Sequence, residues 1–150
     1  MKLLTWLLVS TIASAVDGGA LEADAGVPDP AMQLDISGLR SSKGHVLIAV
    51  YRPGDGFSET KKSAFRKESV PARAGNMTVH LKDLPVGTYA IALIHDENDN
   101  SKIDTGIFGI PIEGFCFSNG AAGVFGPPSF KDASVSHPVG GGTQKLVVKY

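Results

Sequence analysis

The stretch LPVGTYAIALIH, residues 84–95, decides the fold. Pro85 and Gly87 favour a tight corner, and a run that is apolar on both faces follows it. A short apolar run next to turn residues predicts a buried strand rather than the half-buried alternation of a solvated sheet. The stretch therefore predicts a central β-strand that begins at a corner.

Other parts of the chain repeat this β signature. HVLIAVY, residues 45–51, is also apolar on both faces and predicts a second central strand. Shorter segments alternate apolar and polar residues with period two, which predicts strands over 32–36, 76–81, 133–137 and 145–150. Six or seven short strands and no long helical stripe indicate an all-β fold. We expect a single Greek-key β-sandwich of about seven strands.

The corner before Tyr89 supports this architecture. In the tyrosine corner of Greek-key sandwiches, a tyrosine hydroxyl bonds the backbone a few residues upstream, and LPVGTY at 84–89 has that form. The step also resembles one that transthyretin-like and carboxypeptidase-regulatory-like sandwich domains often carry. The resemblance implies a fold and no chemistry.

Residues 57–69, FSETKKSAFRKES, are the one segment with a helical pattern. We expect a short amphipathic helix there, with Phe57 and Phe65 turned inward. The basic residues would form its solvated face: Lys61, Lys62, Arg66 and Lys67.

The N-terminus has the form of a secretory signal peptide. Lys2 precedes an apolar segment that is too short to span a bilayer, and ASA at 13–15 is typical of a cleavage site. We therefore expect a signal peptide over 1–15, a flexible lead-in over 16–30 and one β-sandwich domain over 31–150. The product would be exported, to the periplasm or the medium, with no membrane span after signal removal.

Charge and cysteine content exclude some functions. Loss of Lys2 leaves 13 basic residues against 15 acidic ones, and this balance argues against a nucleic-acid partner. Cys116 is the only cysteine, so the chain cannot form an internal disulfide. Packing, with or without a metal ion, must stabilise the domain.

The segment 105–132 is rich in both glycine and phenylalanine. Flexible linkers avoid aromatic residues, because exposed phenylalanine gains nothing from water. We expect a long ordered loop over one end of the sandwich, with its rings docked and a rigid apolar surface. The residues of this loop surface are Phe108, Phe115, Phe117, Phe125 and Phe130.

The loop DENDNSKID, residues 96–104, has the oxygen spacing of a calcium site. Ca²⁺ binds six or more oxygens, at alternate positions of a loop closed by an acidic residue at position 12. The matching positions are Asp96, Asn98, Asn100, the Lys102 carbonyl and Asp104. Ser101 stands where glycine is usual, and Ile107 stands where the closing acid should be. Glu113 or Asp132 could complete the shell, and an Asx-turn cluster without metal is the alternative.

His95 ends the predicted central strand, in phase with Tyr89, Ile91 and Leu93. A histidine in this position is usually bonded to the backbone of a neighbouring loop. The alternative is a general acid or base paired with Asp96 or Glu113. We assign no catalytic residue, and His95 and Glu113 are the only candidates.

The chain resembles an exported bacterial family known as domain of unknown function 2141. The resemblance covers about residues 32–150 and is carried by GTYAIALIHDEN at 87–98, PIEGFCFSNG at 111–120 and GPPSF at 126–130. Eighteen positions match the family's hallmark pattern: Gly87, Tyr89, Ala90, His95, Asp96, Asn98, Asn100, Asp104, Gly109, Pro111, Glu113, Gly114, Phe117, Ser118, Asn119, Gly126, Pro128 and Phe130. The resemblance implies an exported sandwich domain without an established activity. It also makes Glu113 a better completing ligand than Asp132.

Three functions remain open at this point. The first is a non-catalytic binding or structural module for an extracytoplasmic protein or small ligand, with Ca²⁺ as the only cofactor. The second is a hydrolase-like enzyme that uses His95 with Asp96 or Glu113. The third is a carrier of a small apolar ligand, held among Phe108, Phe115, Phe117 and Phe125.

Overall fold

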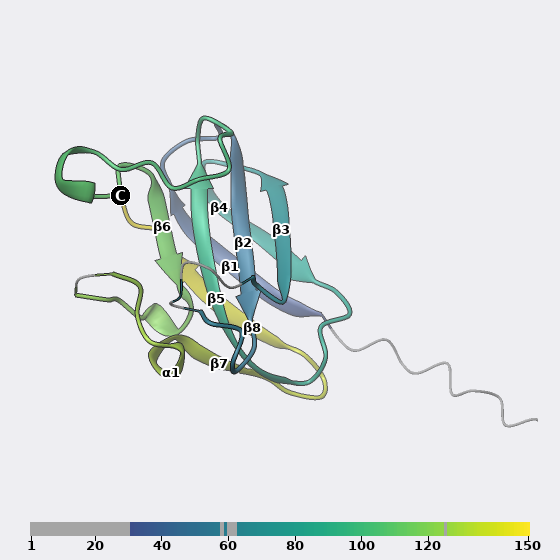
Figure 1. Ribbon diagram of the computed structural model, residues 1–150. Helices are drawn as coiled ribbons and strands as arrows, with labels where there is room; N and C mark the ends of the chain where they lie inside the picture. Colours follow the sequence, from purple (N-terminus) through teal and green to yellow (C-terminus); the bar gives the residue numbers. More distant parts are fainter. Residues whose placement is uncertain (1–30, 58, 60–62, 125) are drawn as a thin grey trace, which may run out of the picture.

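A computed structural model describes residues 31–57, 59, 63–124 and 126–150. The expected signal peptide, the lead-in and Phe125 lie outside the described residues, as do Lys61 and Lys62. The described residues form eight strands in two sheets, arranged as a sandwich with almost no helix (Figure 1). The predicted all-β class is confirmed. No helix in the described part of the chain is long and apolar enough to cross a membrane.

The two sheets have three and five strands. The first has the order β4 (Gly75–Leu81), β1 (Met32–Leu39), β8 (Gly142–Val147), and β1 and β8 are parallel. The second has the order β3 (Arg66–Pro71), β2 (His45–Tyr51), β5 (Gly87–Asp96), β6 (Gly114–Phe117), and β7 (Ser134–His137) also pairs with β5. Three short helical segments complete the fold: η1 (Ile107–Gly109), η2 (Ser118–Gly120) and α1 (Phe130–Ala133).

The strand β5 is the centre of the larger sheet, as its apolar sequence predicts. It pairs along β2 from Ala90 to Asp96, and its side chains alternate into the core between the sheets. Ile91 is fully buried, and residues of this kind each contribute roughly 1.5–3 kcal/mol through removal from water. The Tyr89 hydroxyl donates to the Pro85 carbonyl at 2.7 Å, so the predicted tyrosine corner is confirmed.

Ser118 closes a break in the sheet. On one side of β5, β6 pairs with residues 92–95 and β7 pairs with residues 87–90, so Ile91 falls between them. The buried Ser118 hydroxyl accepts the Ile91 N–H at 2.8 Å and donates to the Ala133 carbonyl. The Ser118 side chain therefore replaces a strand partner, which explains its place in the hallmark pattern without a nucleophilic role.

The helix predicted over 57–69 is wrong where β3 replaces it. Arg66 donates to Glu68 at 2.6 Å, because residues two apart lie on one face of a strand. The strand forms because β2 offers a free edge, and pairing decides the conformation of a short polar segment. Phe57 is buried as predicted, but Phe65 is 38% exposed.

The segment 105–132 is ordered in part as predicted, but it contains β6, which the sequence did not reveal. Within β6, Cys116 faces the core and its thiol is free. Burial raises the pKa of Cys116 to about 12. This cysteine is therefore a small packing residue and no reactive thiol.

Candidate functional site

The loop that follows β5 is organised by the carboxylate of Asp96. Asp96 is 1% exposed, and its two oxygens accept the N–H groups of Asn100 at 3.1 Å and Ser101 at 2.7 Å. Ser101 has a φ of 60°, in the left-handed region that favours glycine. A non-glycine residue costs about 1–2 kcal/mol there, and the bond to Asp96 offsets part of that cost.

Two amide side chains converge with Asp104 on the outer side of the loop. Asn98 and Asn100 donate from Nδ2 to the two oxygens of Asp104, at 2.5 and 2.7 Å. Their own amide oxygens accept the N–H groups of Asn100 at 3.2 Å and Lys102 at 2.9 Å. These are the side-chain to backbone bonds of an Asx-turn cluster. The structure thus brings the sequence-predicted oxygen donors together and satisfies them internally.

Glu113 reaches back to both ends of this loop. Glu113 immediately precedes β6, and its side chain is buried, with 4% of the residue exposed. Its Oε1 accepts the Glu97 N–H at 3.0 Å, and its Oε2 accepts the Asp104 N–H at 3.1 Å. Asp132, the other residue considered as a completing ligand, lies on α1, where Ser129 donates to it at 2.6 Å. Figure 1 shows α1 at the opposite end of the sandwich.

Three carboxylates therefore hold the backbone and side-chain amides of the loop. Among the described residues, Asp96, Asp104 and Glu113 form no ion pair and accept hydrogen bonds only from amide groups. No three His, Cys, Asp or Glu side chains of the described chain stand together as a ready metal site. Any cation here would need the amide oxygens and the Lys102 carbonyl as well as the carboxylates.

His95 lies beneath the loop and is completely buried. Its Nε2 is 2.9 Å from the Lys43 carbonyl, which can only accept, so Nε2 carries the proton. Its Nδ1 then accepts from the Tyr150 hydroxyl, which in turn accepts the Arg40 N–H at 3.1 Å. Both ring nitrogens are engaged inside the protein. His95 ties the loop end of the core to the C-terminal residue.

A surface ion pair covers this histidine. The Arg40 guanidinium lies 4.2 Å from the centre of the Tyr150 ring and bonds to Glu97, and Ser41 donates to Glu97 at 2.6 Å. The hydrogen bond from Arg40 lowers the pKa of Glu97 to about 2, against the opposing effect of burial. Gly114 permits the close approach of Tyr150, since a Cβ there would lie 2.5 Å from its ring.

Sequence reasoning missed several members of this site. His45 pairs with Asp99 at 2.6 Å across the β2 and β5 ends. Nothing local to Arg40 or His45 signals these contacts, because the partners lie more than fifty positions away. The pairing of β2 with β5 brings His45 to Asp99, and the packing of the two sheets brings Arg40 to Glu97. The other two histidines lie outside this site. His80 is exposed on β4. His137 is buried on β7, and neither of its ring nitrogens has a hydrogen-bond partner within the described chain.

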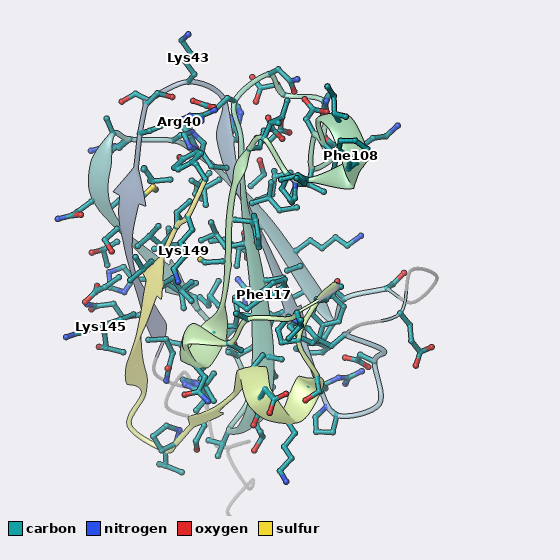
Figure 2. All side chains as sticks on the ribbon, turned by 90° about the vertical axis from the view of Figure 1, so that its left-hand side faces the viewer. Arg40, Lys43, Phe108, Phe117, Lys145 and Lys149 are labelled. Carbon is teal, nitrogen blue, oxygen red and sulfur yellow. The ribbon has the colours of Figure 1, made fainter. Side chains whose placement is uncertain are left out.

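The phenylalanine rings separate into docked and exposed members. Phe117 and Phe130 pack edge-on against Phe57 at 5.7 and 6.3 Å, and Phe115 packs against Phe117 at 6.0 Å. Phe108 is 95% exposed, which corrects the expectation that the rings of this segment dock. The exposed apolar surface of the segment is therefore centred on Phe108, away from the docked cluster (Figure 2).

The geometry described above coincides with a family pattern. The model of the family described as "Uncharacterized protein conserved in bacteria (DUF2141)" matches residues 34–145. The chain belongs to the DUF2141 family. The DUF2141 match runs from β1 into β8 and includes the loop, Glu113 and Ser118, and it confirms the resemblance seen in the sequence. Neither the curated proteins nor the solved structures include a significant match to the chain.

Proposed function

We propose that the chain is an exported, non-catalytic binding or structural module whose 96–104 loop is stabilised by Ca²⁺. The observation that carries the calcium proposal is that Asp96 and Asp104 lie in one loop with the amide oxygens of Asn98 and Asn100 and form no ion pair among the described residues. Buried or half-buried carboxylates favour a counter-charge, and hard oxygen donors favour Ca²⁺. The signal-like residues 1–15 support the export proposal.

Calcium binding would need a small rearrangement of the loop. The Nδ2 groups of Asn98 and Asn100 now occupy the positions next to the Asp104 oxygens. Rotation of each amide by half a turn would present its oxygen to an ion beside Asp104 and Asp96. Glu113 would then hold the two ends of the loop through their N–H groups rather than enter the ligand shell. A site built this way has few charges, which favours a dissociation constant of about 10⁻⁴–10⁻³ M.

Thermal unfolding with and without Ca²⁺ tests the calcium proposal. At ten times the dissociation constant, the ion should add about 1.4 kcal/mol, or a rise in Tm of about 5 °C, which EDTA reverses. Asp104→Asn should abolish the rise, because it removes a ligand charge. Asp99→Asn is the matched control, because Asp99 lies in the same loop but pairs with His45. An identical melting curve in EDTA and in 10 mM Ca²⁺ refutes calcium binding.

The other two functions have no specific observation in their favour. The hydrolase-like alternative needs a histidine that a substrate can reach, whereas His95 is 0% exposed and bonded on both nitrogens. The carrier alternative needs an apolar cavity among the phenylalanine rings. The two described surface hollows lie elsewhere, one beside Arg52 and Phe65 and one on the outer face of β1, β4 and β8.

A further inference from the structure

The strand β4 forms one edge of the three-stranded sheet, and it pairs with β1 on one side only. Every second residue of such a strand directs its N–H and C=O groups away from its partner. The described residues make no hydrogen bond to the backbone of Gly75–Leu81 apart from the ladder with β1. This edge therefore offers a row of unpaired backbone groups to another strand.

The features that usually protect an edge from pairing are missing in β4. Natural edge strands carry charged residues or proline, or they are very short. The other edges of the described sheets follow this rule: β3 has three charged residues and Pro71, β8 has Lys145, and β6 and β7 have four residues each. The seven residues of β4, GNMTVHL, include no Asp, Glu, Lys, Arg or Pro. The edge of β4 is thus the one best suited to pair with another chain.

The sequence of β4 is complementary to itself. Its midpoint is Thr78, so a two-fold axis at Thr78 pairs the whole of Gly75–Leu81 with the same strand of a second copy, in antiparallel register. Thr78 then lies opposite its counterpart, and Asn76 lies opposite His80 of the second copy. All three side chains are exposed on the outer face of the sheet, where such polar pairs form hydrogen bonds.

The charges at the two ends of β4 fit the same register. Arg73 lies two positions before the strand and Asp83 lies two positions after it, so Arg73 of each copy approaches Asp83 of the other. Both residues are exposed, and neither forms an ion pair within the described part of the chain. Lys82 lies opposite the uncharged Ala74, so no like charges face each other across the axis. Opposite charges placed in this way favour one register over the others.

We propose that two copies of the chain pair along β4, so that their three-stranded sheets join into one sheet of six strands. A two-fold contact of this kind is closed and stops at a dimer. The hollow on the outer face of β1, β4 and β8 is lined in part by Asn76 and Thr78. Pairing extends this hollow across the axis and adds His80 of the second copy to its wall. The inference goes beyond the proposed function and does not rest on calcium.

Analytical ultracentrifugation over a range of protein concentrations tests the proposal. The wild type should show a reversible equilibrium between monomer and dimer. Thr78→Lys should raise the dissociation constant of the dimer about tenfold or more, because it places two like charges opposite each other at the axis. Thr143→Lys is the matched control, since Thr143 is exposed on the same face of the same sheet but lies on β8. A wild type that stays monomeric, or equal association by the two variants, refutes the proposal.

A charge exchange tests the register. Arg73→Glu alone and Asp83→Lys alone should each weaken the dimer, because like charges then meet at both ends of the paired strands. An equimolar mixture of the two variants should associate as the wild type does, since every end of the mixed dimer again has opposite charges. A mixture that associates no better than either variant would contradict this register.

Cross-linking gives an independent readout. The only native thiol, Cys116, is buried, so Thr78→Cys places one accessible thiol at the axis. Opposite residues of antiparallel strands have Cα atoms about 4.5–5.5 Å apart, within the range of about 4.4–6.8 Å that a disulfide spans. Oxidation by dissolved oxygen should give a covalent dimer of Thr78→Cys but not of Thr143→Cys. Equal cross-linking of both would show random collision and overturn the proposal. A calcium-dependent Tm in a monomeric protein would refute this inference alone.

Discussion

Replacement of Glu113 by glutamine tests the link between the loop and the core. Both Glu113 oxygens accept backbone N–H groups, from Glu97 at 3.0 Å and Asp104 at 3.1 Å. A glutamine side chain has the same shape as glutamate, but its NH₂ group would face one of these N–H donors. One hydrogen bond is therefore lost, and the other is made to a neutral oxygen instead of a charged one. Hydrogen bonds to charged groups contribute about 1.5–3 kcal/mol each. The variant no longer buries a charged carboxylate, and the removal of that desolvation cost offsets part of the loss. We expect the free energy of unfolding to fall by about 2 kcal/mol.

Urea denaturation at pH 7 measures this change directly. The control is Asp99→Asn, which removes one exposed ion pair and should cost less than about 1 kcal/mol. Amide hydrogen exchange adds a local readout, because the N–H groups of Glu97 and Asp104 should lose protection in Glu113→Gln. A cost below about 0.5 kcal/mol, together with unchanged exchange at both amides, would show that Glu113 does not tie the loop.

Three further predictions concern other parts of the structure. Ser118→Ala should lower the free energy of unfolding by about 2–4 kcal/mol in urea denaturation, because the buried Ile91 N–H and Ala133 carbonyl lose their hydrogen-bond partner. Ser136→Ala, at an exposed position, should change it by less than about 0.5 kcal/mol. The folded pKa of Glu97, about 2, lies below its ordinary 4.5, so its contribution is present above pH 4.5 and is lost as the pH falls toward 2. With allowance for solvent screening, the wild type should lose about 1 kcal/mol more than Glu97→Gln over that interval, and parallel stability curves would contradict this. Cys116 should react with a thiol reagent at pH 8 only after unfolding; rapid labelling of the native protein would contradict its burial.

Local signals in the sequence were enough to predict the centre of the fold. The corner before Tyr89 and the apolar run into His95 carry turn residues and β periodicity within a dozen positions. The strands β3 and β6 carry no such signal, because each is short and becomes a strand through pairing with β2 or β5. Pairing is a long-range interaction, and a polar or glycine-containing segment does not record it.

The candidate site shows the same division. The loop oxygens lie within nine positions of one another, and their spacing was sufficient to predict that they meet. Arg40, His45 and Tyr150 reach the site because β1 ends there, β2 begins there and the segment after β8 returns there. The ligand count of the loop names Glu113 or Asp132, and the family resemblance favours Glu113, but neither predicts the contacts that Glu113 makes. It was expected to complete a ligand shell, and the structure shows it accepting the N–H groups at the two ends of the loop.

Glu113 also holds the base of the turn that contains Ile107, the residue at the position where a calcium loop would place its closing acid. Glu113 accepts the Asp104 N–H, and Ile112 donates to the Asp104 carbonyl. These two bonds hold the base of the turn from Thr105 to Ile112. Ile107 lies in this turn and is 79% exposed. A single buried carboxylate, that of Glu113, thus holds both ends of the polar loop and with them the base of the 105–112 turn.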